Sequence, residues 1–173
     1  MTKNNIINSL RLISICTFIL FTVSGSMVFA DVAKIDSNFD GKMDQWRHTT
    51  ADGKIFKVEH DTNFDGNIDQ VEHFVGDKIL VKAEFDADKN GKMDQIQHYS
   101  DQGKLEKIEK DSKNTGKFDW KEKFDANEKI ERVEIDENGD GKVDIRQYFD
   151  ANQTIKQTDY DTDFNGTTDR WDY

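Results

Sequence analysis

The sequence predicts an all-β protein built from tandem hairpin repeats. One pattern restarts every 25 residues, and each repeat contains two short runs rich in β-branched and aromatic residues, separated by turn sequences. After residue 30, no stretch offers the roughly ten uninterrupted residues of 3.6 periodicity that a helix needs. We therefore expect an elongated antiparallel meander of β-hairpins, with a solenoid or a closed barrel as alternatives.

Each repeat opens with a nine-residue segment rich in aspartate and asparagine. Its six copies, called loops 1 to 6, start at residues 36, 61, 86, 111, 136 and 161. Positions one and nine are always aspartate, position six is always glycine, and positions three and five are mostly Asn or Asp. Short oxygen-bearing side chains at alternate positions converge on one point where a glycine allows a sharp turn. The pattern therefore predicts an oxygen cage for a hard cation such as calcium.

These segments resemble the Asp-x-Asp/Asn-x-Asp/Asn-Gly calcium loops of EF-hands, dockerins and thrombospondin type 3 repeats, and the resemblance is confined to the loops. In an EF-hand, a main-chain carbonyl at position seven and a bidentate Glu at position twelve complete the cage. Here position twelve is acidic in loops 2, 4 and 6 only. Loop 4 departs further, because Lys113 and Thr115 occupy positions three and five, and we expect it to bind weakly or not at all.

The predicted calcium ligands are the side chains at positions one, three, five and nine, the carbonyl at position seven, and the acids at position twelve of loops 2 and 6. They are Asp36, Asn38, Asp40, Lys42, Asp44, Asp61, Asn63, Asp65, Asn67, Asp69, Glu72, Asp86, Asp88, Asn90, Lys92, Asp94, Asp136, Asn138, Asp140, Lys142, Asp144, Asp161, Asp163, Asn165, Thr167, Asp169 and Asp172.

The alternative interpretation is that the loops are only Asx-rich turns, since turns also favour Asp, Asn and Gly. Six copies in strict period argue against it, because a turn needs no aspartate at position nine and gains nothing from gathering charges that repel one another.

Two strands are expected in each repeat. The first strands are expected at 43–49, 68–74, 93–99, 118–124 and 143–149, and the second at 55–60, 79–85, 105–110, 130–135 and 155–160. The turns between them include Gly76-Asp77 and Asp101-Gln102-Gly103, which are typical of short hairpin connections. Residues 31–35 correspond to the second half of a truncated repeat, and residues 166–173 to the first half of another.

Residues 1–30 have the features of a secretory signal peptide. They contain two basic and no acidic residues, an apolar run over 12–23 and a small residue, Ala30, at the expected cleavage point. The run is too short for a comfortable membrane span, although a retained N-terminal anchor is the alternative. The single cysteine, Cys16, lies in this segment, so residues 31–173 form no disulfide. We expect residues 31–173 to be one repeat domain that is secreted or periplasmic.

The charge of the predicted mature chain is concentrated in the loops. Without Lys3 and Arg11, 22 basic residues face 35 acidic ones, and 17 of those acids occupy loop positions one, three, five or nine. Bound calcium would neutralise most of this charge, and no basic patch is visible. A nucleic-acid partner is therefore not expected.

Neither face of the predicted sheet is cleanly apolar, so the core is expected to be thin. At tenfold excess of calcium over its dissociation constant, each site would add about 1.4 kcal/mol, and six would add roughly 8 kcal/mol. We expect the fold to depend on calcium and to be loose without it, because the loop aspartates repel each other.

Two other groups of residues are candidate sites. His48, His73 and His98 share one repeat position, but in a meander they would lie two strands, about 9.6 Å, apart, too far to share a zinc ion. Five of the aromatic residues either pack the sheet or form a stacking surface for a glycan or peptide, namely Trp46, Tyr99, Trp120, Tyr148 and Trp171. No nucleophile with a base lies outside the loops, so no enzyme is expected.

The sequence thus favours a secreted calcium-binding repeat protein with a structural or adhesive role. The alternative is a glycan or cell-wall binding module in which calcium is only structural.

Overall fold

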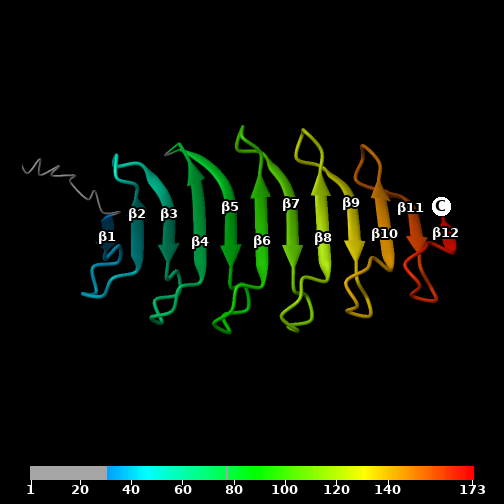
Figure 1. Ribbon diagram of the computed structural model, residues 1–173, viewed down its shortest axis with the longest axis horizontal. Helices are drawn as coiled ribbons and strands as arrows, with labels where there is room; N and C mark the ends of the chain where they lie inside the picture. The colour runs from blue at the N-terminus through cyan, green and yellow to red at the C-terminus, as the bar shows by residue number, and fades with distance from the viewer. Residues whose placement is uncertain (1–30, 77) are drawn as a thin grey trace, which may run out of the picture.

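The computed structural model describes residues 31–76 and 78–173. The predicted signal peptide with Cys16, and Asp77 of a predicted turn, lie outside the described residues. The described part forms one 12-stranded antiparallel sheet whose strand order follows the sequence, with β1 and β12 at its two edges (Figure 1). The structure is therefore the open meander. In this part of the chain, no helix is long and apolar enough to cross a membrane.

The strand bounds match the expected hairpins closely. The strands are β1 (Asp31–Ile35), β2 (Gln45–Thr49), β3 (Ile55–His60), β4 (Gln70–Val75), β5 (Ile79–Phe85), β6 (Gln95–Tyr99), β7 (Leu105–Lys110), β8 (Trp120–Phe124), β9 (Ile130–Ile135), β10 (Ile145–Phe149), β11 (Ile155–Tyr160) and β12 (Arg170–Asp172). All five predicted second strands are correct to the residue. The five predicted first strands begin two residues later than expected, because positions eight and nine still belong to the loop.

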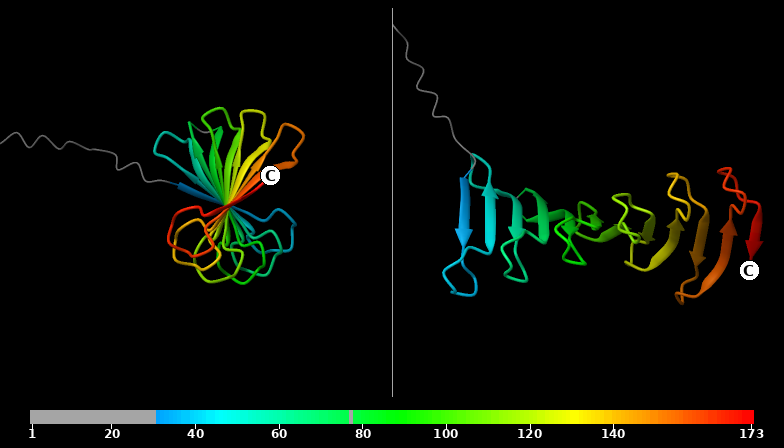
Figure 2. Two further views of the ribbon diagram at one scale, coloured as in Figure 1. Left: turned by 90° about the vertical axis from the view of Figure 1, so that its right-hand side faces the viewer. Right: turned by 90° about the horizontal axis from the view of Figure 1, so that it is seen from below.

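The sheet is a single layer with a strong twist. Seen along its length, the strands fan around one axis, with all the short turns on one side and all the aspartate-rich loops on the other (Figure 2). A progressive twist between neighbouring strands is the normal consequence of backbone sterics. We call the two long borders the turn rim and the loop rim.

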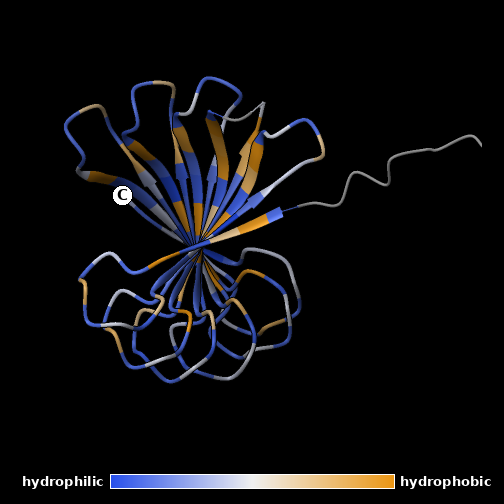
Figure 3. Ribbon diagram, turned by 90° about the vertical axis from the view of Figure 1, so that its left-hand side faces the viewer, coloured by the Kyte–Doolittle hydropathy of each residue, from blue (hydrophilic) through white to orange (hydrophobic). Residues whose placement is uncertain are grey.

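One row of small side chains forms the core. Val58, Ala83 and Val133 are the buried hydrophobic residues of the described chain, and they occupy equivalent positions on β3, β5 and β9. Each lies directly opposite longer polar side chains of the flanking strands, as Val133 lies opposite Glu122 and Gln147. Polar and apolar colours alternate along the strands in Figure 3. The core is therefore as thin as the sequence predicts.

The opposite face carries a ladder of ion pairs. Glu59 on β3 lies 2.6 Å from Nε2 of His48 and 2.7 Å from Nζ of Lys57. The same arrangement recurs around Glu84, with His73 and Lys82. One repeat further on, it recurs around Glu109, with His98 and Lys107. Each of the three histidines therefore pairs with its own glutamate, which agrees with a role in filling the sheet face.

These contacts favour the ionised glutamates. Burial opposes ionisation of Glu84, but hydrogen bonds from Lys82 and His73 outweigh it and lower the pKa of Glu84 below the ordinary value of 4.5. A carboxyl whose pKa is lower in the folded state stabilises the fold above its unfolded pKa and loses that contribution as the pH falls through the folded value.

We expect Val133→Ala to lower the free energy of unfolding by about 1–2 kcal/mol, because it removes buried methyl groups from the core row. The matched control is Val75→Ala on β4, where the side chain is 58% exposed and the loss should be about 0.5 kcal/mol or less. Urea unfolding followed by circular dichroism measures both, and equal losses would contradict the assignment of the core.

We expect Glu84→Gln to weaken the fall in stability on acidification below the ordinary glutamate pKa of 4.5, because the amide cannot titrate. The variant should be less stable than the wild type at neutral pH and should differ from it less at low pH. Urea unfolding at a series of pH values measures this. Glu106→Gln, an exposed glutamate on β7, is the control and should leave the pH profile unchanged.

Candidate metal centre

Each loop folds around its own first aspartate. In loop 3, the Asp86 carboxylate accepts the amides of Asn90 at 3.0 Å and Gly91 at 2.7 Å. Loops 1, 2, 4 and 6 use the same two amides, whereas loop 5 uses those of Gly139 and Gly141. The glycine at position six has φ between 83° and 97° in all six loops, which any other residue would adopt only with strain. The first carboxylate is therefore held in place by the loop backbone.

The ninth aspartate closes each loop from the other side. Asp94 accepts the amides of Ala87 and Asp88 at 3.1 and 3.2 Å. Burial of these carboxylates is extensive: seven of the first and ninth aspartates are buried, namely Asp44, Asp61, Asp69, Asp86, Asp119, Asp144 and Asp161. The described residues thus bury more loop aspartates than hydrophobic side chains.

In loops 3 and 6, three aspartates converge. One carboxylate oxygen from each of Asp86, Asp88 and Asp94 lies within 4.8 Å of the other two. The same holds for the equivalent triad at positions one, three and nine of loop 6, which is Asp161, Asp163 and Asp169. A group of carboxylate oxygens at this spacing suits a hard divalent cation.

Loops 1, 2 and 5 carry asparagine at position three. The side-chain oxygens of Asn38, Asn63 and Asn138 accept the amide of position five, as Asp88 does in loop 3. At position three these loops therefore keep the hydrogen bond of loop 3, with an amide oxygen in place of one carboxylate.

Loop 5 also contains a carboxylate oxygen that lacks a partner. Oδ2 of Asp144 accepts the amides of Glu137 and Asn138 at 2.6 and 3.1 Å, but Oδ1 is buried and has no hydrogen-bond partner among the described residues. Leaving a buried polar atom without a partner costs free energy. A cation bound by Oδ1 would remove that cost.

Loops 2 and 4 have a lysine close to the ninth aspartate. Nζ of Lys89, which belongs to loop 3, lies 2.9 Å from Oδ2 of Asp69 in loop 2. In loop 4, Nζ of Lys113 lies 3.6 Å from Oδ2 of Asp119. An ammonium group and a metal ion compete for the same oxygen. The sequence predicts the lysine in loop 4, whereas it gives no sign of the lysine at loop 2, which comes from the next repeat.

Position five accepts a hydrogen bond from the amide of position seven. This bond joins Asp40 to Lys42, Asp65 to Asn67, Asn90 to Lys92, Asp140 to Lys142 and Asn165 to Thr167. The bonds from Asn67 and Asn63 lower the pKa of Asp65 below its ordinary value.

The two predicted ligands at position twelve lie on strands. Glu72 on β4 accepts a hydrogen bond from Gln70 at 2.9 Å and lies 3.6 Å from Nε2 of His60. Asp172 on β12 lies 3.2 Å from Arg170. Both carboxylates are engaged with residues of the sheet, and Asp172 is not a member of the loop 6 triad.

In each triad, one carboxyl has a pKa below its ordinary value. Burial opposes ionisation of Asp161, but the amides of Gly166 and Asn165 outweigh it and lower its pKa. Burial likewise opposes ionisation of Asp88, and the side chain of Asn114 with the amide of Asn90 lowers its pKa. At neutral pH these loops therefore present negative charge.

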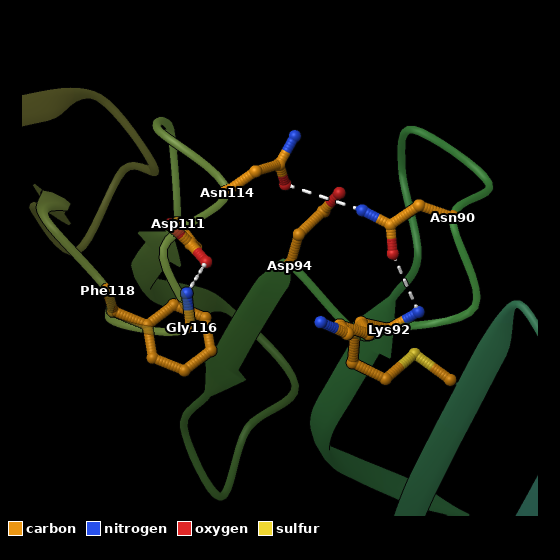
Figure 4. Close-up of a pocket in the computed structure, with 8 residues that line it drawn as sticks. Asn90, Lys92, Asp94, Asp111, Asn114, Gly116 and Phe118 are labelled. Atoms are coloured by element: carbon orange, nitrogen blue, oxygen red, sulfur yellow. Dashed lines mark hydrogen bonds between the residues drawn. The ribbon is translucent and has the colours of Figure 1, made fainter.

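Neighbouring loops are in direct contact. The amide of Asp61 in loop 2 donates to the carbonyl of Asp44 in loop 1 at 2.9 Å, and every later pair of loops repeats this bond. Between loops 3 and 4, Asn114 donates to Oδ2 of Asp88 at 2.7 Å. Figure 4 shows Asn90 and Asn114 approaching each other across the recess between these two loops. A change in the conformation of one loop therefore alters its hydrogen bonds to the next loop.

The five aromatic residues of the candidate stacking surface do not share one face of the sheet. The strand registers place Trp46, Tyr148 and Trp171 on one face of the sheet and Tyr99 and Trp120 on the other. Trp46 on β2 and Trp171 on β12 also lie near opposite ends of the sheet.

Comparison with known proteins identifies no family. No protein-family model matches the chain, and no curated protein sequence matches it. One similar solved structure is the crystal structure of accessory secretory protein 1, 2 and 3 in Streptococcus pneumoniae, with 20% identity and a TM-score of 0.44. The match covers 61% of this chain and 19% of that chain, so this chain spans about a fifth of its length.

We expect Lys89→Asn to raise the affinity of loop 2 for a divalent cation by about fivefold, because it removes an ammonium group that competes for the buried Asp69 carboxylate, and an ion pair worth about 1 kcal/mol corresponds to that factor. Asparagine tolerates the positive φ of this position. Isothermal titration with calcium measures the change. Lys92→Asn removes the same charge from loop 3 and serves as control; an equal gain there would show a general charge effect instead of competition at Asp69.

Proposed function

We propose that this is a secreted calcium-binding repeat protein whose loops bind calcium along the loop rim and whose role is structural or adhesive. The observation that carries the proposal is the convergence of the first, third and ninth aspartates in loops 3 and 6. The buried, unpartnered oxygen of Asp144 in loop 5 supports it independently.

Calcium fits the donor set better than other common ions. The donors are carboxylate and amide oxygens held on a flexible loop, which calcium accepts in variable geometry, whereas magnesium demands near-ideal octahedral coordination. Zinc favours nitrogen and sulfur donors, and the six loops contain neither histidine nor cysteine. Sites of extracellular modules have dissociation constants of about 10⁻⁴ to 10⁻³ M, which would suffice outside a cell.

Calcium would also stabilise the sheet. The core row is thin, and the loops concentrate buried negative charge. Each site at tenfold excess would add about 1.4 kcal/mol, an appreciable share of the roughly 5–15 kcal/mol of a typical domain. The proposed role of the metal is therefore to stiffen an extended surface that a partner contacts.

Two further features define the proposal. Secretion is proposed from the composition of residues 1–30, which matches a signal peptide. The proposed activity is binding rather than catalysis, because the loop carboxylates are assigned to metal. A glycan-binding module is not advanced, because the five candidate aromatic side chains are divided between the two faces of the sheet.

We expect calcium to raise the melting temperature and to increase the β signal in circular dichroism, starting from protein in chelator. Magnesium at the same concentration should have a smaller effect. A β-rich spectrum in chelator, with neither spectrum nor melting temperature responding to calcium, would show that the loops are ordinary turns.

The matched variants are Asp94→Asn, which removes one carboxylate from the loop 3 triad, and Asp101→Asn, which makes the same change at the turn rim. Calorimetric titration should show weaker binding for the first and unchanged binding for the second. Equal behaviour of the two variants would locate the calcium outside loop 3.

A further inference from the structure

The two edge strands of the sheet are complementary to each other. Inside the sheet, strands of two kinds alternate: those that leave an aspartate-rich loop, such as β2 and β4, and those that lead into one, such as β3 and β5. β12 is of the first kind and β1 of the second. Among the described residues, β1 and β12 each have one neighbouring strand. Inside the sheet, the edge equivalent to their other side pairs with a strand of the other kind.

The internal register can be applied to these two edges. Within the sheet, Trp46 pairs with Glu59, Arg47 with Val58 and His48 with Lys57. At the equivalent repeat positions, β12 of one copy beside β1 of another would bring Trp171 opposite Lys34, Asp172 opposite Ala33 and Tyr173 opposite Val32. No like charges would meet directly, and an aromatic side chain would face a β-branched one, a favourable cross-strand pair.

Exposure at the edges agrees with this pairing. Ala33 occupies the repeat position of the core row, where Val58 and Ala83 are 6% and 2% exposed, yet Ala33 itself is exposed because it has a strand on one side only. Across the proposed contact, Trp171 and Tyr173 are 50% and 92% exposed. A second copy would extend the core row and cover these aromatic rings.

A separate feature of the loop rim points to the same contact. The side chain at position four of a loop lies against the preceding loop: Lys89 contacts Thr62 and Asp69, and Phe64 borders the same recess as Ser37 and Asp44.

Phe39 is the position-four residue of loop 1, and no described loop precedes it. It is 90% exposed, whereas Phe64 and Phe164 at the same position are 46% and 43% exposed. All three have positive φ, an uncommon conformation for a bulky residue. At the other end of the sheet, no described loop covers Thr162 and Asp169 of loop 6, which are the equivalents of Thr62 and Asp69. Phe39 of one copy could therefore lie against loop 6 of another copy, as Phe64 lies against loop 1 within the sheet.

From these two matches we infer that copies of this protein associate end to end, with β12 of one copy pairing antiparallel with β1 of the next and Phe39 resting on loop 6. The partner is a second copy of this chain, because the contact reproduces the internal repeat in strand type, register and loop packing. Such a head-to-tail contact leaves a free edge at each end, so it extends into an open row rather than closing as a dimer. The inference goes beyond the proposed function and does not require the loops to bind calcium.

Analytical ultracentrifugation over a wide range of protein concentration tests this inference. The full chain is expressed, the protein is purified in the form that the host secretes, and its N-terminus is determined by mass spectrometry. The wild type should form a concentration-dependent series of monomer, dimer and larger species, both in calcium and in chelator. Ala33→Asp should abolish the larger species, because it puts a charge in the core row opposite Asp172 of the next copy.

Three further variants make the test specific. Combining Ala33→Asp with Asp172→Lys should restore association, which a simple folding defect would not allow. Phe39→Ala should weaken association, whereas Phe64→Ala, the same change inside the sheet, should leave it intact.

Several outcomes would overturn the inference. They are a wild type that stays monomeric at every concentration, assembly that stops at a dimer, or larger species that persist in the Ala33→Asp variant. Equal effects of the two phenylalanine substitutions would show that Phe39 does not contact loop 6.

Discussion

The hydrogen bonds between loop amides and the first and ninth aspartates determine how the strands can follow one another. They hold each loop in a similar compact shape between the strand that enters it and the strand that leaves it. The ninth aspartate also donates its own amide to the carbonyl that precedes its loop, as Asp44 does to Ile35. The regular spacing of the strands therefore depends on carboxylates that belong to no strand.

A single-layer sheet has no second layer against which to bury its side chains. The chain compensates with contacts between adjacent strands: one row of small apolar residues on one face, and glutamates held by histidine and lysine on the other. Both kinds of contact join nearest neighbours only, as in other repeat architectures. Stability is thus distributed along the sheet. Repulsion between the loop carboxylates has a large effect on that stability, because little buried apolar area offsets it.

The sequence predicts the hairpins well because each is a local structure, with its turn residues, strand residues and loop glycine within one repeat. It predicts the side chains of loop 3 equally well, since Asp86, Asp88 and Asp94 are close in sequence and meet in space. It could not predict that Lys89 reaches Asp69, because this contact crosses from one repeat to the next. The ligand at position twelve stays a prediction; Glu72 at that position lies on β4, where it pairs across the sheet with Ala83.

The twist of the sheet has a consequence for anything that contacts the loop rim. Successive loops point in directions that rotate around the long axis, so the loops at the two ends face different sides (Figure 2). A flat, rigid surface meets only a few consecutive loops, whereas a flexible polymer can follow the rotation and contact them all. The number of contacts made at once, and with it the avidity, is therefore determined by the stiffness of the partner as much as by its chemistry.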